Sequence, residues 1–414
     1  MSFDKKTSLG FIDVASGKTS IMICSFANPD KPVLLGKGEV ETKGFVGGRV
    51  VNFSEFSNCV NKALEIAELQ AGGNISNVVL SLSDFKYRSS YVSSKEIEFP
   101  FEETITKKYI EQCAYRIDFQ NKIDRDKEAI IHIVPVRYVV DGNKVVLNPE
   151  GIFAKKIRAV YHIVTVDGQM LSDFEAVLKS LNLTVVKVST NSYASSQAVL
   201  VDDDKNIGSL VIDIGKSSMS VAAFVEGSFF FNCSFLLGGD TITNWLSRKL
   251  NVRFDEAERL KIKYGVRPPV ALDFSQYINA FVIGENGENE AQEILKSTYL
   301  LCANEVARQI VQLVSKKLSG NVLPYINRII LTGGGSKLIG LKEIFEDVLD
   351  CSVRVGRPVH IDVLGDGFDD VEYSTLVGLY LLYKNQHIVN DVVEKKENDN
   401  LWRKFKSIWD ECFG

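Results

Sequence analysis

The chain has 414 residues and 45% hydrophobic content, so more than one hydrophobic core and two to four domains are expected. A net charge of −5 and the absence of a basic run of five residues argue against a general nucleic-acid-binding protein. Seven scattered cysteines without a CxxC pair predict reduced thiols in a cytosolic protein, and four separated histidines suggest no metal cluster or catalytic histidine.

The N-terminus lacks the apolar segment of a signal peptide, and no apolar run approaches the eighteen residues of a membrane span. The expected protein is therefore soluble, with at most a peripheral membrane contact.

Two similar small-residue turns stand 200 residues apart, at residues 12–18 (IDVASGK) and 212–218 (IDIGKSS). Each turn joins two apolar strands, and a helical pattern follows at Glu55–Ala71 in the first copy and at Ile242–Leu250 in the second. This repeat predicts two related α/β domains that face each other across a cleft.

Between the two copies, residues 85–165 read as a small α+β module inserted into the first domain. A strand-like run at 86–92 precedes an amphipathic helix at Ile105–Ile117 and strands at 129–140 and 157–166.

After the second turn the sequence predicts a helix at Asp255–Tyr264, closed by Gly265, and a long helix at Ala291–Leu318. A strand then leads into residues 331–336 (LTGGGS), and a helix follows at Leu341–Leu349.

Three of these segments are candidates for nucleotide binding. In the two turns, backbone N–H groups can approach phosphate, Lys18 and Lys216 can neutralise it, and Asp13 and Asp213 can hold Mg²⁺ through water. Glycines 333–335 leave space for adenine and its α-phosphate before a helix start. Glu258 and Lys261, three residues apart on one helix, can bracket a ribose. The alternatives are structural turns and a surface ion pair worth about 0.3 kcal/mol.

A polar stretch at 394–400 (EKKENDN) precedes an amphipathic helix at 401–414. Its bulky apolar arc and basic flank favour the lipid headgroup boundary, whereas docking on its own domain or in a partner's groove are the alternatives. The residues expected at the membrane are Leu401, Trp402, Arg403, Lys404, Phe405, Ile408, Trp409 and Phe413. Burial worth roughly 9–18 kcal/mol nearly cancels the cost of ordering the segment, so one copy should bind weakly and a polymer well.

Together these features resemble the actin/Hsp70/sugar-kinase ATPase fold and, within it, the FtsA family of bacterial cell-division proteins. The resemblance covers most of the chain. It rests on residues 51–53 (VNF), 132–141 (HIVPVRYVVD), 148–152 (NPEGI), 159–165 (AVYHIVT), 257–265 (AERLKIKYG), 331–336 (LTGGGS), 373–379 (YSTLVGL) and the amphipathic tail.

The resemblance implies an α/β, actin/Hsp70-like two-lobed fold with an inserted small α+β (1C, SHS2-like) module and a C-terminal amphipathic helix. The implied division of the chain is subdomain 1A at 1–84 with 166–195 and 371–389, 1C at 85–165, 2A at 196–238 with 324–370, 2B at 239–323, a linker at 390–400 and a membrane-targeting helix at 401–414.

The resemblance also implies that the protein binds ATP and Mg²⁺, polymerises, and anchors the FtsZ ring to the inner face of the cytoplasmic membrane at the division site. The extreme C-terminus of FtsZ would bind 2B, and later division proteins would bind 1C. The implied nucleotide-binding residues are Asp13, Ser16, Gly17, Lys18, Asp213, Gly215, Lys216, Ser217, Ser218, Gly239, Glu258, Lys261, Gly333, Gly334, Gly335 and Ser336.

This sequence departs from the family pattern in both turns. Ala15 replaces a glycine in the first, Lys216 and Ser217 replace two glycines in the second, and Ser220 stands where an aspartate is frequent. Side chains at 216 and 217 narrow the approach to the β- and γ-phosphates. We therefore expect nucleotide binding with slow or no hydrolysis, hence at most a weak ATPase, and no catalytic residue is assigned.

Two other functions share this superfold. One is an actin-like pilus-assembly protein, which should lack the membrane-seeking tail and bind the cytoplasmic peptide of a membrane protein. The other is a small-molecule kinase, which would need a catalytic aspartate near the second turn, where Ser220 stands instead.

Overall fold

The computed structural model describes residues 3–29, 31–83, 86–119, 123–124, 126–284, 288–320, 322–359, 361, 364 and 367–390. Residues 391–414, which contain most of the predicted linker and the whole predicted membrane helix, lie outside this set.

The first sheet has five strands in the order β12-β6-β1-β2-β3. Its first three strands in sequence form an antiparallel meander, and the other two add in parallel next to β1. The strands are β1 (Ser8–Val14), β2 (Lys18–Ser25), β3 (Val33–Glu41), β6 (Asn77–Leu82) and β12 (Thr184–Thr190).

The second sheet repeats this arrangement in the order β15-β14-β13-β18-β19. Again a three-stranded antiparallel meander is extended by two parallel strands next to its first strand. The strands are β13 (Ser209–Ile214), β14 (Met219–Val225), β15 (Ser228–Phe235), β18 (Arg328–Thr332) and β19 (Ser352–Val355).

The internal repeat extends to strand register. Asp13 lies opposite Ser20 in the first hairpin, and Asp213 lies opposite Ser220 in the second. Both aspartates are therefore delivered to the same point of their sheets, one residue before the first strand ends. The predicted pair of related α/β units is present.

Helices cover the first sheet and separate it from the second. Helix α1 (Phe53–Ala71) buries Phe56, Val60, Ala63 and Ala67 at helical spacing, and the Asn52 side chain accepts a hydrogen bond from Glu55 N at 3.2 Å at its start. Helix α3 (Gly168–Ser180) packs beside α1, whereas α4 (Asn191–Val199) and α10 (Ser374–Asn390) pack along each other and α4 contacts strands of both sheets. One hydrophobic cluster joins these helices to the first sheet and to the facing side of the second.

Strands β7 (Arg88–Ser93), β8 (Ile97–Thr104), β9 (Glu128–Val140), β10 (Lys144–Val146) and β11 (Phe153–Asp167) form a separate sheet, with α2 (Lys107–Tyr115) packed on β11. This module has a hydrophobic cluster of its own. It rests on the second sheet through β15, where His162 Nδ1 lies 3.1 Å from Phe229 O.

A second hydrophobic cluster holds α6 (Gly239–Leu250), α7 (Phe254–Tyr264), α8 (Lys296–Leu318) and α9 (Leu341–Leu349) against the second sheet. The predicted helix at 291–318 begins too early, because residues 289–295 form β17 (Asn289–Leu295) in a hairpin with β16 (Tyr277–Ile283). The remaining strands and α-helix are β4 (Phe45–Val46), β5 (Arg49–Val50) and α5 (Asp202–Ile207). Four 3-10 helices are described, η1 (Ala271–Phe274), η2 (Leu323–Tyr325), η3 (Gly334–Lys337) and η4 (Val371–Tyr373).

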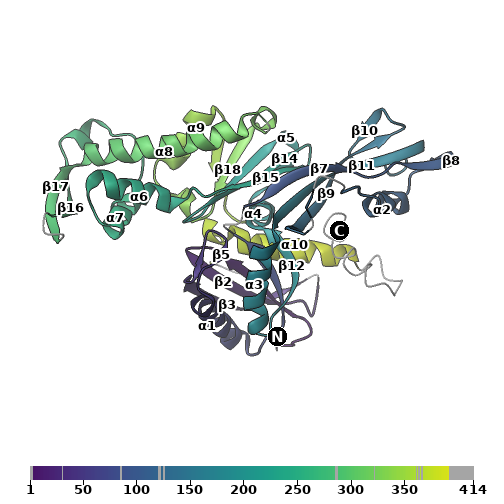
Figure 1. The fold of residues 1–414 in the computed structure, drawn as a ribbon, viewed down its shortest axis with the longest axis horizontal. Coiled ribbons are helices and arrows are strands. Elements are labelled where there is room, and N and C mark those ends of the chain that lie inside the picture. The colour runs from purple at the N-terminus through teal and green to yellow at the C-terminus, as the bar shows by residue number, and fades with distance from the viewer. Residues whose placement is uncertain are drawn as a thin grey trace.

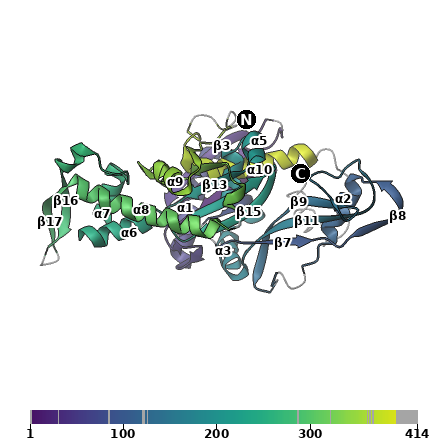
Figure 2. The same cartoon turned by 90° about the horizontal axis from the view of Figure 1, so that it is seen from above.

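The molecule is elongated, with the β16–β17 hairpin at one end and β8 at the other (Figure 1). The first sheet, with α1 and α3, lies below the centre in that view, and the view from above places the same two ends far apart (Figure 2). Among the described helices, none combines the length and apolar character needed to cross a bilayer.

Candidate functional site

A cavity of about 520 Å³ lies between the two sheets, where the two small-residue turns face each other. Its lining includes most of the residues predicted for nucleotide binding. These are Asp13, Gly17, Lys18, Asp213, Gly215, Lys216, Ser218, Gly239, Glu258, Lys261, Gly333, Gly334 and Gly335.

The two turns touch at their tips. Ser217 Oγ donates a hydrogen bond to Ser16 Oγ at 2.8 Å, so these two predicted residues bridge the turns and are not part of the cavity lining. Each turn is closed by a short backbone hydrogen bond, from Ala15 N to Lys18 O at 3.1 Å and from Gly215 N to Ser218 O at 2.8 Å. The sequence repeat thus forms a matched pair of turns on opposite sides of one cavity.

Both predicted metal-binding carboxylates are oriented by hydroxyl groups that sequence reasoning missed. Ser83 Oγ donates to Asp13 Oδ1 at 2.8 Å, and Thr375 Oγ1 donates to Asp213 Oδ2 at 3.0 Å. Asp213 is buried, whereas Asp13 is half-buried. Ser83 directly follows β6 and is marked by no local motif, whereas Thr375, in the first turn of α10, lies within the family-like segment 373–379 but was not assigned to the site.

The glycine loop is packed directly against the second turn. Gly333 has φ of +76°, and a Cβ there would lie 2.3 Å from Asp213 Oδ1. A Cβ on Gly335 would lie 2.4 Å from Ile214 Cγ2. Only glycine fits at these two positions. Ser336 is buried and donates to Gly333 O at 2.7 Å, so it stabilises the loop from behind and does not line the cavity.

The Glu258–Lys261 pair is not an ordinary surface ion pair. Lys261 is buried, and its Nζ lies 2.7 Å from Glu258 Oε2 and donates to Gly239 O at 3.0 Å. Thr243 links the two side chains, since it accepts from Lys261 and donates to Glu258. The pair therefore joins α7 to the start of α6 at the edge of the cavity.

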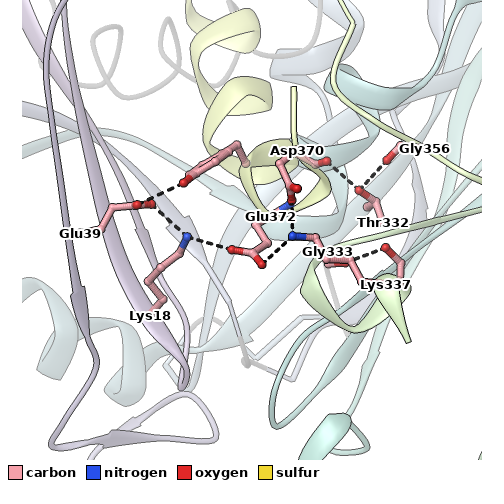
Figure 3. A network of polar contacts seen from close by, with 11 residues as sticks. Lys18, Glu39, Thr332, Gly333, Lys337, Gly356, Asp370 and Glu372 are labelled. Atoms are coloured by element: carbon pink, nitrogen blue, oxygen red, sulfur yellow. Dashed lines mark hydrogen bonds and ion pairs between the residues drawn. The ribbon is translucent and has the colours of Figure 1, made fainter. Parts of the chain in front are cut away.

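Lys18 takes part in an ion-pair network that includes two other lining residues of the cavity, Lys337 and Glu372 (Figure 3). Its Nζ lies 3.0 Å from Glu39 and 3.3 Å from Glu372, and Lys337 Nζ lies 2.9 Å from Glu372. Lys337 also pairs with Asp370 at 2.7 Å. The network connects the first sheet to η4 and to the end of η3, the 3-10 helix that contains Gly334 and Gly335. It therefore occupies a lysine that the sequence assigned to phosphate.

The network shifts the pKa values of its members. The hydrogen bond from Lys337 lowers the pKa of Glu372 despite the opposing effect of burial. Burial alone would lower the pKa of Lys18, but the hydrogen bond to Glu39 and the nearby carboxylates raise it overall. Both groups are therefore held in their charged forms.

No group of three or more His, Cys, Asp or Glu side chains among the described residues is arranged to hold a metal ion. The water-mediated Mg²⁺ contact of Asp13 and Asp213 stays a prediction. The predicted membrane residues, from Leu401 to Phe413, lie outside the described part of the chain.

Family models match both the second half of the chain and the inserted module. A family model described as "Cell division protein FtsA" matches residues 210–378, and one described as "SHS2 domain inserted in FTSA" matches residues 86–165. The chain is 28% identical to the cell division protein FtsA of Buchnera aphidicola subsp. Acyrthosiphon pisum, over 99% of this chain and 98% of that protein. It is 25% identical to that of Escherichia coli (strain K12), over 98% of each.

Solved structures at lower identity share the fold. The PilM-PilN type IV pilus biogenesis complex matches with a TM-score of 0.60 and 16% identity, over 89% of this chain and 96% of that chain. MreB5 of Spiroplasma citri bound to ADP matches with a TM-score of 0.54 and 10% identity, over 94% and 99%. The predicted actin-like fold with an inserted module is confirmed.

Proposed function

Because this chain belongs to the FtsA family of cell-division proteins, we propose that it is a nucleotide-binding, polymerising adaptor that ties the FtsZ ring to the cytoplasmic membrane. A role in cell division follows from the family itself. The nucleotide, FtsZ and membrane functions are proposed from separate parts of the chain.

The observation that carries the nucleotide function is the matched pair of turns around one cavity. Its volume, about 520 Å³, lies within the roughly 300–1,000 Å³ of small-molecule sites. Gly333 to Gly335 would receive the adenosine, Glu258 and Lys261 the ribose, and the two turns the phosphates. Asp13 and Asp213 would hold Mg²⁺ through water, and the ion would neutralise phosphate charge when bound.

Hydrolysis is expected to be slow or absent. Ser220, which lies opposite Asp213 in the hairpin, is buried and carries a hydroxyl in place of the carboxylate frequent in the family. The contact between Ser16 and Ser217 also closes the space between the two turn tips. The proposed role is therefore structural, with nucleotide serving assembly.

FtsZ is proposed to bind residues 239–323, on an apolar surface formed by η1 and β16. Leu272, Phe274, Tyr277 and Phe281 are each between 47% and 63% exposed. Tyr277 and Phe281 share one face of β16, because side chains alternate along a strand. Large apolar side chains exposed on two elements that are adjacent in the chain are candidates for a protein-binding surface, and the apolar end of a peptide would cover them. The inserted module is proposed to receive later division proteins.

The membrane contact is proposed to come from residues 401–414. A single weak anchor becomes effective when a polymer presents many copies, since each later contact is intramolecular. Changing Trp402 and Trp409 to Glu, or deleting 401–414, should abolish co-sedimentation with liposomes. Retained binding would disprove this anchor.

The whole proposal is tested by imaging a fluorescent fusion of the full-length chain in dividing cells. We expect a mid-cell ring. Deleting 401–414 should disperse it, and changing Leu272 and Phe274 to Glu should leave the fusion on the membrane outside the ring. Changing Leu69, an 85% exposed side chain on α1, to Glu is the control for added surface charge and should keep the ring.

A folded fusion that never enters the division site would refute the adaptor function. Accumulation at pilus-assembly sites would favour the pilus-assembly alternative.

A further inference from the structure

Four lysines line the cavity, and three of them are already paired with acids. Lys18 lies 3.0 Å from Glu39 and 3.3 Å from Glu372, as Figure 3 shows. Lys337 lies between Asp370 and Glu372, and Lys261 lies 2.7 Å from Glu258. These three ammonium groups are neutralised before any ligand arrives.

The fourth, Lys216, forms no ion pair with any residue that the structure describes, and it is exposed. The aliphatic part of its side chain nevertheless packs against the first turn. A Cβ on Gly17 would lie 3.3 Å from Lys216 Cβ and 3.4 Å from its Cδ, so the stem runs over the first turn. Lys216 O accepts a hydrogen bond from Asp240 N at 2.8 Å, which fixes the backbone at the start of α6.

Lys216 therefore brings to the two turns the one cavity lysine that forms no ion pair with a described residue. This is the location at which the phosphates of a nucleotide would need a counter-charge. An ammonium group is a compact cation with three hydrogen-bond donors, and it binds phosphate as a point charge.

Two aspartates that line the same cavity make a weak metal site on their own. Asp13 and Asp213 each accept a hydrogen bond from a hydroxyl, of Ser83 and Thr375, and the described residues offer no third carboxylate or histidine arranged with them. An ion held there would depend on water and phosphate for most of its ligands. Its main contribution would be charge neutralisation, which Lys216 can also provide.

We propose that Lys216 is a built-in counter-cation for the nucleotide phosphates, so that this chain binds nucleotide without requiring a divalent metal ion. The inference rests on the proposed nucleotide-binding function.

The test measures ATP binding to the full-length protein by isothermal titration calorimetry, in excess Mg²⁺ and in excess EDTA. Wild-type affinity should change less than about threefold between the two conditions. Lys216→Met, which removes the charge and keeps the length, should lose about tenfold in EDTA and regain most of it with Mg²⁺. Lys216→Arg, which keeps the positive charge, should retain more of the affinity in EDTA than Lys216→Met does.

Lys316→Gln, on the exposed side of α8, controls for loss of a positive charge elsewhere, and thermal unfolding checks that each variant is folded. The inference is overturned if wild-type binding falls more than tenfold in EDTA, or if Lys216→Met binds as wild type there. If wild type binds no ATP in either condition, the proposed nucleotide function fails as well.

Discussion

The two turns of this protein share a backbone frame and differ in their charges. In each, an aspartate precedes the turn and faces a serine across the hairpin. In the first turn Gly17 carries no side chain, and Lys18 is held by Glu39 and Glu372. In the second turn the stem of Lys216 packs over Gly17, and its ammonium group pairs with no acid in the part of the chain that the structure describes. A repeated fold therefore does not imply repeated chemistry at its two copies.

The two aspartates differ in how deeply they are buried. Asp213 is buried beneath Gly333 and bonded to Thr375, whereas Asp13 is half-buried and bonded to Ser83. The second turn is therefore the more tightly packed of the two, and changes around it should have larger effects.

The largest effect is expected for Gly333→Ala. A Cβ at this position would lie 2.3 Å from Asp213 Oδ1 on backbone with φ of +76°, so overlap and strain should destabilise the fold by about 2–5 kcal/mol. Urea unfolding measures the change. Gly334→Ala is the matched control, since its Cβ would lie 3.6 Å from the nearest side-chain atom, and equal losses in both variants would contradict the packing argument.

The two hydroxyl donors give the next comparison. Thr375→Val should cost about 1–3 kcal/mol, because it leaves one oxygen of a buried carboxylate without this donor. Ser83→Ala should cost less, because water can reach the half-buried Asp13. Urea unfolding measures the free energy of unfolding that each variant loses. A larger loss for Ser83→Ala would contradict the inference that the second turn is the more tightly packed.

Restoring glycine at both 216 and 217 should make the second turn more like the family pattern. With Mg²⁺ present, any ATPase rate should rise by roughly tenfold if the two side chains impede the phosphates, a change of about 1.4 kcal/mol in the barrier. Phosphate release under single-turnover conditions measures it. An unchanged rate would point to Ser220 as the limiting difference.

The smallest effect is expected for Glu372→Gln, which breaks the link from Lys18 to Lys337. Glu372 is 41% exposed, so the loss should stay below about 1 kcal/mol. The lowered pKa of Glu372 means that its contribution is present above its ordinary pKa of 4.5 and disappears as the pH falls through the folded-state value. The pKa values of Lys18 and Lys337 are raised, so the stability that these two lysines contribute is lost as the pH rises above 10.5.

Thermal unfolding across this pH range checks the sign. Wild type and Glu372→Gln should differ most between about pH 4.5 and pH 10.5, and the difference should shrink as the pH falls below 4.5 through the folded-state pKa of Glu372 or rises above 10.5 through those of the two lysines. A difference that does not shrink as the pH falls below 4.5 would mean that Glu372 acts through packing and not through its charge.

Most of the candidate site follows from local sequence. Turns, a glycine loop and two residues three apart on a helix leave local signatures, and all the predicted cavity residues except Ser16, Ser217 and Ser336 line it. The helix predicted to start at residue 291 was wrong at its beginning, because pairing with β16 holds residues 289–295 in a strand. That pairing is a contact between segments, which helical periodicity does not reveal.

The sequence by itself determined the repeated frame of this protein, since an aspartate followed by small residues between two apolar strands specifies a hairpin through local backbone preferences. Only the tertiary structure decided which charges remain free. Glu39, Asp370 and Glu372 reach Lys18 and Lys337 from distant segments, and Gly17 receives the stem of Lys216 from 199 residues away along the chain. Coulombic pairing depends on distance in space, so lysines that look equivalent in sequence are not equivalent in the cavity.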